Sequence, residues 1–208
     1  DVIFRQEHPP GQLGLSDFTT LKDVIITINN LPLNHILYHF RLACSGWSHM
    51  KVILGGESYS ALTEGLQEAL WRLGGAPLIH RTDSLAAAFK NVSRDDIDDM
   101  TQRYQQFCEH YGMHATRNNL GVSHENGSIE SPHGHIKRRI KQALLLRGSN
   151  DFGTVEAYQA WLDGVINQHN RRNAKNLKVE LPHLAALPLD KAVDFTEVCA
   201  RVSSSSTI

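Results

Sequence analysis

The order of strand-like and helix-like segments is the feature that most constrains how this chain can fold. Three strand-like segments joined by short connections come first, and after them helices and strands alternate. Strands joined by short turns pair antiparallel, whereas a strand reached through a crossover helix lies parallel to its neighbour. The order therefore predicts an α/β fold, with a five-stranded mixed sheet that is antiparallel over its first three strands and has helices on both faces.

Hydrophobic periodicity, together with turn and capping residues, sets the boundaries of these segments. The expected strands are residues 13–20 with a continuation at 24–28, then 35–44, 50–54, 77–80 and 113–116. The expected helices are a first one capped by Ser58 or Ser60 and closed by Gly74-Gly75, then 95–111, one from about 129 to 144, and 154–170. Asn29-Asn30 is a turn signal, and the composition of the chain after Asn173, with Pro182 and Pro188, is linker-like.

The stretch from residue 123 to 141 combines a turn at Asn126-Gly127 with two helical stripes. The apolar stripe, which predicts a core-facing side, consists of Ile129, Ile136, Ile140 and Leu144. The second stripe has members spaced by four, three and four residues, namely Glu130, Gly134, Lys137 and Lys141. It is either the solvated charged face of an amphipathic helix, or a face on which the acid holds a metal and the lysines hold a polyanion.

Composition sets broad limits on the class of protein. A chain of 208 residues with 41% hydrophobic content can bury a full core. No run approaches the roughly 18 to 20 apolar residues of a membrane span, and no signal pattern opens the chain. Three widely spaced cysteines (Cys44, Cys108 and Cys199) fit free thiols in a reducing compartment, so a cytoplasmic location is expected.

The net charge is -1, but the charge is unevenly distributed. Residues 133–178 carry nine Lys or Arg against three acids, a local balance of +6 that leaves the remainder near -7. A basic segment in an otherwise acidic chain is compatible with a nucleic-acid face beside an acidic metal site, or with a solvated helical extension.

The domain organisation expected from these patterns has four parts. Residues 1–12 form a linker, 13–150 a catalytic core and 151–180 a helical extension of that core. Residues 181–208 are predicted to be a linker followed by the start of a truncated C-terminal β domain. Because the first residue is Asp1 and the last stretch resembles an interrupted strand, the sequence is interpreted as a fragment of a longer protein.

Three acids stand at informative positions. Asp17 lies inside the first strand, where Asp is disfavoured and would be costly if buried without a partner. Asp83 follows the fourth strand, at the carboxyl end where open α/β sheets carry functional groups. Glu130 opens a later helix. Each alone has a structural explanation, as a strand-edge acid, a turn acid or a first-turn acid favoured by the helix dipole. All three together indicate a site.

These acids lie in motifs that resemble a known family. Asp17-Phe18-Thr19, residues 81–84 (Arg-Thr-Asp-Ser) and residues 125–130 (Glu-Asn-Gly-Ser-Ile-Glu) are similar to the three motifs of the retroviral-integrase superfamily of transposases. Residues 167–172 are similar to the Asn-plus-Arg signature of that family. Within the superfamily the chain looks most like bacterial insertion-sequence transposases of the IstA type, over roughly residues 10 to 175.

The resemblance implies an RNase H-like fold and a DNA transposase that cuts at the ends of its element and joins the freed 3'-hydroxyls to target DNA. It implies Asp17, Asp83 and Glu130 as catalytic residues and as ligands of two Mg²⁺ or Mn²⁺ ions, and hard carboxylate oxygens suit these ions. It further implies a homo-multimer on DNA, an AAA+ ATPase helper and association with the nucleoid. The residues expected to contact DNA are Lys137, Arg138, Lys141, Arg171 and Arg172.

The chain departs from the family pattern at two points. The separation of 47 residues between Asp83 and Glu130 is longer than in retroviral integrases, and a helix-loop insert at 91–125 would explain it. Pro132 is tolerable only in the first turn of a helix, so Glu130 must lie at the very start. Two alternatives stay open: a structure-specific nuclease of the same fold, and an inactive DNA-binding or assembly module. Zinc is disfavoured because no Cys-x₂₋₄-Cys pair accompanies Cys108, His110 and His114.

Overall fold

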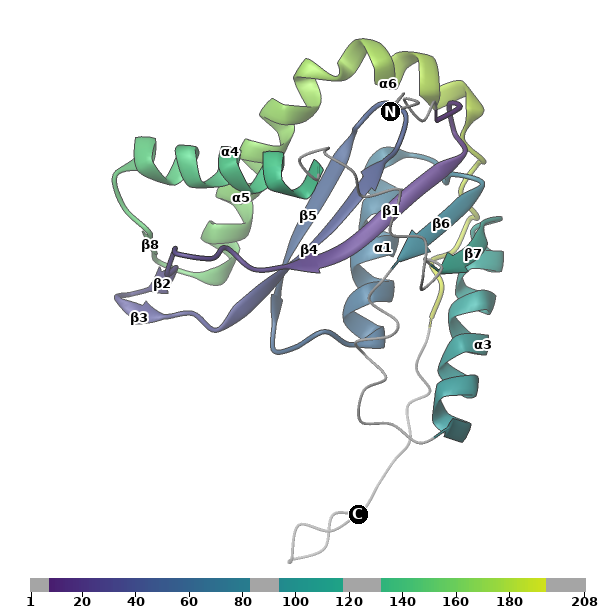
Figure 1. Cartoon of the computed structure of the whole chain (residues 1–208), viewed down its shortest axis with the longest axis horizontal. Helices are drawn as coiled ribbons and strands as arrows, with labels where there is room; N and C mark the ends of the chain where they lie inside the picture. The colour runs from purple at the N-terminus through teal and green to yellow at the C-terminus, as the bar shows by residue number, and fades with distance from the viewer. Residues whose placement is uncertain (1–7, 83–93, 118–131, 194–208) are drawn as a thin grey trace, which may run out of the picture.

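The computed structural model describes residues 8–82, 94–117 and 132–193. A five-stranded mixed sheet lies at its centre, in the order β5-β4-β1-β6-β7 (Figure 1). Its strands are β1 (Leu13–Thr19), β4 (His35–Leu42), β5 (Ser48–Leu54), β6 (Ile79–Thr82) and β7 (His114–Arg117). β1, β4 and β5 pair antiparallel, whereas β6 and β7 are parallel to β1. The predicted sheet, antiparallel over its first three strands, is confirmed.

Helices α1 (Tyr59–Leu73) and α3 (Arg94–His110) pack on one face of this sheet. The ends of α1 follow from its sequence, because the Ser58 hydroxyl accepts a hydrogen bond from the Ala61 amide at 3.1 Å and Gly74 ends the helix in the left-handed conformation. Gly65 lies against the Tyr38 ring, where a Cβ would come within 2.5 Å of a ring carbon. Glycine is therefore required for α1 to sit this close to the sheet.

Helices α4 (Pro132–Arg147) and α5 (Val155–Arg172) pack on the opposite face, so helices cover both faces as predicted. Ile136, Ile140 and Leu144 are buried against this second core, which confirms the apolar stripe. The Thr154 hydroxyl caps α5 by accepting from the Ala157 amide at 3.1 Å.

A second, three-stranded sheet at one end of the molecule corrects one prediction. It consists of β2 (Thr27–Ile28), β3 (Leu31–Pro32) and β8 (Asp151–Phe152). The strand expected at 24–28 is thus reduced to two residues, and it leaves the main sheet. Asn29 and Asn30 both have positive φ, as a two-residue hairpin turn requires. Asp151 fixes this turn by accepting hydrogen bonds from Thr27 and from the Asn30 amide.

The linker predicted directly after Asn173 is wrong, because the chain continues into α6 (Ala174–Glu180) and the short 3₁₀ helix η2 (Leu181–His183). Glu180 is fully buried, and its carboxylate accepts hydrogen bonds from the amides of Gly11 at 3.1 Å and Ser45 at 2.9 Å. Ala185 then forms a bridge with Ala76. These contacts hold the segment after α5 against the start of β1. Pro182 and Pro188 favour a linker in the sequence pattern, and for this reason α6 was not predicted.

Among the helices in the described ranges, none is both long enough and apolar enough to cross a bilayer.

Candidate functional site

Asp17 lies on β1, whose side chains alternate between the two faces of the sheet. Ser16 and Phe18 face α1 and α3, so Asp17 faces the side that α4 and α5 cover. Its partner in the antiparallel register is His39 on β4, and its side chain is half-buried. Asp17 lies within β1, the middle strand of the sheet, so its predicted position inside the first strand is confirmed.

The end of β6 lies directly beside Asp17. Ser16 pairs with Thr82 in the parallel ladder between β1 and β6, and Thr82 is buried. Asp17 and Asp83 each follow one of these paired residues in the sequence. Asp83 itself lies outside the described residues, as do Glu125 and Glu130. Helix α4 begins at Pro132, two residues after Glu130, so the proline occupies the first turn, where it is tolerated.

A buried hydrogen-bond network lies beneath this position, on the α1 and α3 side of the sheet. The Ser16 hydroxyl is 2.6 Å from the Tyr38 hydroxyl and 2.7 Å from His80 Nε2, and His80 Nδ1 bonds the Tyr104 hydroxyl. Burial lowers the pKa of His80 to about 3, so its ring is neutral. The network joins β1 and β6 to α3, which follows the segment carrying Asp83.

Sequence reasoning misses this network. The sequence pattern places His80 only as the last residue of the short strand expected at 77–80 and Tyr104 only on the apolar face of the helix expected at 95–111, and it does not single out Ser16. A histidine in such a strand is the available signal, because a buried imidazole needs partners on both ring nitrogens.

The basic residues of α4 have different surroundings. Lys137 is half-buried, and Arg138 is exposed and donates to His135 Nδ1 at 2.9 Å. Lys141 forms an ion pair with Asp23 at 3.4 Å, in which the acid is 88% exposed. Exposed pairs of this kind are weak, so phosphate can compete for this lysine. Arg171 and Arg172 are exposed on the last turn of α5.

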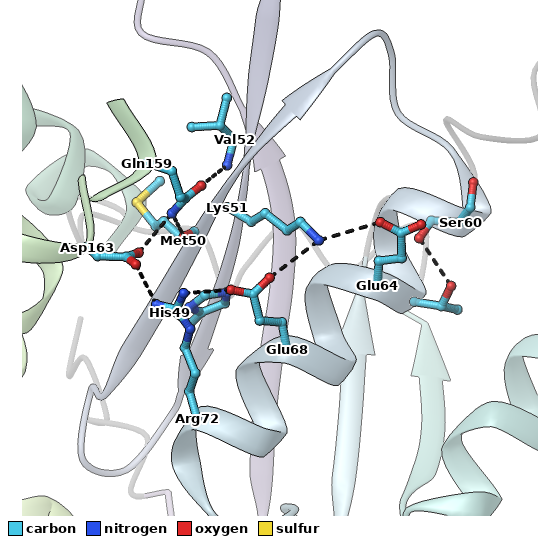
Figure 2. Close-up of polar contacts among 11 residues, drawn as sticks. His49, Met50, Lys51, Val52, Ser60, Glu64, Glu68, Arg72, Gln159 and Asp163 are labelled. Carbon is cyan, nitrogen blue, oxygen red and sulfur yellow. Dashed lines mark hydrogen bonds and ion pairs between the residues drawn. The ribbon is translucent and has the colours of Figure 1, made fainter. Parts of the chain in front are cut away.

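Asn170, within the Asn-plus-Arg signature, has a structural role. Its side-chain amide accepts from the Ser48 amide at 2.9 Å and donates to the Ser48 carbonyl at 2.8 Å. Gln159, three helical turns earlier on α5, makes the same pattern with Val52 N–H at 2.7 Å and the Met50 carbonyl at 3.0 Å (Figure 2). The two amides satisfy outward backbone groups of β5, which lies at the edge of the sheet.

Titratable side chains from β5, α1 and α5 form a second polar group, which we call the ionic network (Figure 2). Its members are His49, Lys51, Glu64, Glu68, Arg72 and Asp163. Arg72 is 2.8 Å from both Glu68 and Asp163, and Lys51 is 3.4 Å from Glu68. Burial lowers the pKa of His49 to about 4, so this histidine is neutral near pH 7. Both cations are paired with acids from neighbouring elements or turns, which indicates a structural role.

Within the residues that the structure describes, no group of three or more His, Cys, Asp or Glu side chains is placed to hold a metal ion. Cys108 is buried in the first core, where burial raises the pKa of its thiol to about 12. His110 is exposed and bonds the Asp190 carbonyl at 2.9 Å. Asp17 is the member of the predicted carboxylate triad that lies in the described part of the chain.

No family model matches the chain. It is 54% identical over 203 residues to the uncharacterized protein y4jA/y4nE/y4sE of Sinorhizobium fredii (strain NBRC 101917 / NGR234), a match that covers 98% of this chain and 40% of that protein. The chain therefore spans less than half the length of the curated relative that it matches.

Two solved structures are similar in fold. A chain of the simian T-cell lymphotropic virus intasome in complex with the PP2A regulatory subunit B56 gamma gives a TM-score of 0.58 at 15% identity, over 94% of this chain and 63% of that chain. The HTLV-2 integrase catalytic core domain in complex with magnesium, in its dimeric form, gives 0.49 at 16% identity, over 77% of this chain and 86% of that one. The intasome likeness and the order of the mixed sheet identify an RNase H-like fold of the integrase-core kind.

Proposed function

We propose that this chain is the catalytic core of a DNA transposase that hydrolyses phosphodiesters at the ends of its element and joins the 3'-hydroxyls to target DNA. The observation that carries the proposal is the pairing of Ser16 with Thr82 in adjacent parallel strands. Asp17 and Asp83 come next in the two strand sequences, so continuation of the ladder by one residue would bring both carboxylates to the same edge and face. The IstA-type assignment rests on the sequence motifs.

Asp17, Asp83 and Glu130 are proposed as the catalytic carboxylates and as the ligands of two Mg²⁺ or Mn²⁺ ions. Three carboxylates form a hard oxygen donor set, which fits these ions. When bound, such ions stabilise charge on the attacking and leaving oxygens of a phosphodiester. The chain itself would hold the Asp17 carboxylate in a fixed position. Asp17 lies in the central strand β1, and the adjacent residue Ser16 is hydrogen-bonded to Tyr38 and His80.

The proposed DNA contacts are Lys137, Arg138 and Lys141 on α4 and Arg171 and Arg172 at the end of α5. Exposed or half-buried basic side chains on these helices can reach phosphates without sequence preference. A homo-multimer assembled on DNA and an AAA+ ATPase helper are proposed as partners, and the nucleoid as the cellular location. These proposals concern the longer protein, because the chain spans 40% of its curated relative.

Comparing two glutamate variants in the full-length protein tests the function. With Mn²⁺ and pre-cut DNA ends, Glu130→Gln is expected to abolish joining while leaving DNA binding intact, and Glu125→Gln, the matched control, should lower activity modestly at most. A rigid helix start holds a catalytic ligand better than a loop does. Parent protein that cleaves but never joins would identify a nuclease instead. Loss of joining only in Glu125→Gln would move the third ligand to residue 125.

Metal binding provides a test that does not depend on turnover. Mg²⁺ or Mn²⁺ is expected to raise the melting temperature of the parent by mass action on the folded state. The Asp17→Asn variant should lose this response, because a neutral amide is a much weaker ligand for a hard cation than a carboxylate. Thermal denaturation of both proteins with and without the metal measures the difference. An unchanged shift in the variant would place the ion elsewhere.

A further inference from the structure

Three arginines from three different elements act electrostatically on His169 of α5. They are Arg41 on β4, Arg139 on α4 and Arg172 on the last turn of α5, and we call them the arginine cluster. The pKa of His169 is lowered first by burial and then by the positive charges of Arg139, Arg41 and Arg172. The charge of Arg172 also adds to the burial that lowers the pKa of Arg139. Geometry agrees, because Arg172 lies one helical turn after His169 and Ile140, the residue after Arg139, lies in the same buried core as Ile166 on α5.

The turn at Gly46 gives this neighbourhood a fixed frame. His169 Nε2 donates to the Gly46 carbonyl at 3.1 Å, and Asn173 Nδ2 donates to the same oxygen at 3.2 Å. A Cβ on Gly46 would come within 3.2 Å of Asn173 Nδ2 and 3.7 Å of Arg41 Nη2, and Gly46 has a positive φ of 74°. A side chain at this position would strain the backbone and crowd Asn173, so glycine lets the turn, α5 and Arg41 lie close together.

The cluster lacks carboxylate partners among the described residues. None of the three arginines there has an acid within 4.0 Å, whereas Arg72 pairs with two acids and Lys141 with Asp23. Glu180 lies near enough to Arg41 to oppose the lowering of its pKa by burial, but both oxygens of this carboxylate already accept backbone amides. Three arginines with one nearby carboxylate leave an excess of positive charge, and a bound anion would reduce it.

The cluster begins on the face of the sheet that carries Asp17. In the ladder between β1 and β4, Leu15 pairs with Arg41 and Asp17 pairs with His39. Residues two apart on a strand share a face, so Arg41 and Asp17 are diagonal neighbours on one side of the sheet. A polyanion bound by the arginines would therefore approach the same face as the proposed catalytic acids.

We propose that Arg41, Arg139 and Arg172 form a phosphate-binding site that holds a DNA backbone phosphate away from the reacting one. The planar guanidinium fork suits bidentate contact with phosphate oxygens, and groups from three elements can enclose one phosphate. The identity of the polymer rests on the proposed function, whereas the anion site itself does not. The proposed function already includes Arg172 as a DNA contact. The new elements of the site are Arg41, Arg139 and the turn at Gly46 that binds His169 and Asn173.

The first experiment uses inorganic phosphate as the probe. At constant ionic strength, replacing chloride by phosphate is expected to raise the melting temperature of the parent, because the anion binds the folded state. The shift should shrink in Arg139→Gln and vanish in the double variant Arg139→Gln, Arg172→Gln. The matched control is Arg72→Gln, which removes a guanidinium from the ionic network and should keep the parental shift. A full shift in the double variant would overturn the site.

The second experiment measures the affinity for a duplex oligonucleotide over a range of salt concentrations. Removing one arginine that neutralises a phosphate should reduce the slope of log affinity against log salt by about 0.9, so the double variant should show a slope smaller by up to about 1.8. Arg139→Lys with Arg172→Lys keeps both charges and should restore most of the slope. These helix-surface variants avoid the half-buried Arg41. An unchanged slope in the double variant would contradict the proposal for DNA.

The two proposals fail in different ways. A parent protein that responds to phosphate and binds duplex through the cluster but never cuts or joins DNA would retain the anion site and remove the transposase function. A parent that joins DNA, with a double variant that keeps the parental phosphate shift and salt slope, would retain the function and remove the site. A phosphate response that depends on the cluster, without any cluster-dependent effect on duplex binding, would restrict the site to small anions and contradict its role toward DNA.

Discussion

The ionic network and the arginine cluster both involve α5, but they treat charge in opposite ways. In the ionic network, Arg72 contacts Glu68 and Asp163 at 2.8 Å, and Lys51 has acids at 3.4 and 3.5 Å. In the arginine cluster, three positive charges act on His169, and no acid among the described residues comes within 4.0 Å of these arginines. The ionic network pairs its cations with acids at short distance, whereas the arginine cluster keeps an excess of positive charge that would favour an external anion.

Replacing the side-chain amides of α5 should have the largest effect on stability. These variants test the structural function of the helix separately from its proposed role in binding. Replacing Gln159 by Leu leaves Val52 N–H and the Met50 carbonyl without their partner. Two unsatisfied backbone groups should cost roughly 2 to 4 kcal/mol of unfolding free energy. Urea denaturation measures the loss.

Gln168→Leu on the exposed side of α5 is the matched control and should cost little. Asn170→Leu should behave like Gln159→Leu, because Ser48 depends on it for both backbone groups. If Asn170→Leu kept parental stability, the hydrogen bonds of Asn170 with Ser48 would not contribute to the stability of the fold.

Burial of His49 should make the stability of the ionic network depend on pH. Burial lowers its pKa in the folded protein to about 4, from 6.5 for the free side chain. As the pH falls below 6.5 the unfolded chain takes up a proton first, so stability is lost progressively between about pH 6.5 and 4. At pH 5 the loss should be about 2 kcal/mol. His49→Gln, compared with the parent by urea denaturation at several pH values, should show a flatter profile. Parallel profiles would mean that His49 does not titrate in this window.

Single arginine replacements in the two regions should have small effects of opposite sign. Arg72→Gln breaks two ion pairs at a half-exposed position and should lower stability by at most about 1 kcal/mol. Arg139→Gln relieves like-charge repulsion and should raise stability by a few tenths of a kcal/mol at low salt, with the gain disappearing as salt screens the charges. Thermal denaturation at low and high salt distinguishes the two. A destabilising Arg139→Gln would show that this arginine is compensated after all.

Local patterns predicted much of the fold. Ser58 and Gly74 bound α1 because caps are set by nearby residues, and the spacing of Ile136, Ile140 and Leu144 identified the buried side of α4. The alternation of strands and helices predicted the mixed sheet and its first three antiparallel strands. These features are predictable because they are determined by residues close to one another in the sequence.

Features built from distant residues were not predictable in this way. Glu180 binds the amides of Gly11 and Ser45, 169 and 135 residues away, and no local pattern signals that α6 docks there. The bonds of Ser16 with His80 and of Asn170 with Ser48 likewise depend on the completed sheet. For the candidate site, motifs identified Asp17 and its strand, but not the neutral histidine behind it. Asp83 and Glu130 remain predictions.

The amide contacts along β5 have a further consequence for how the molecule behaves in concentrated solution. An edge strand with free amides and carbonyls can add a strand from another molecule and begin a growing aggregate. Gln159 and Asn170 occupy such groups at Ser48, Met50 and Val52 through side chains, without adding a strand. Two polar residues on one helix thereby occupy four of the backbone groups through which this edge could pair with another chain.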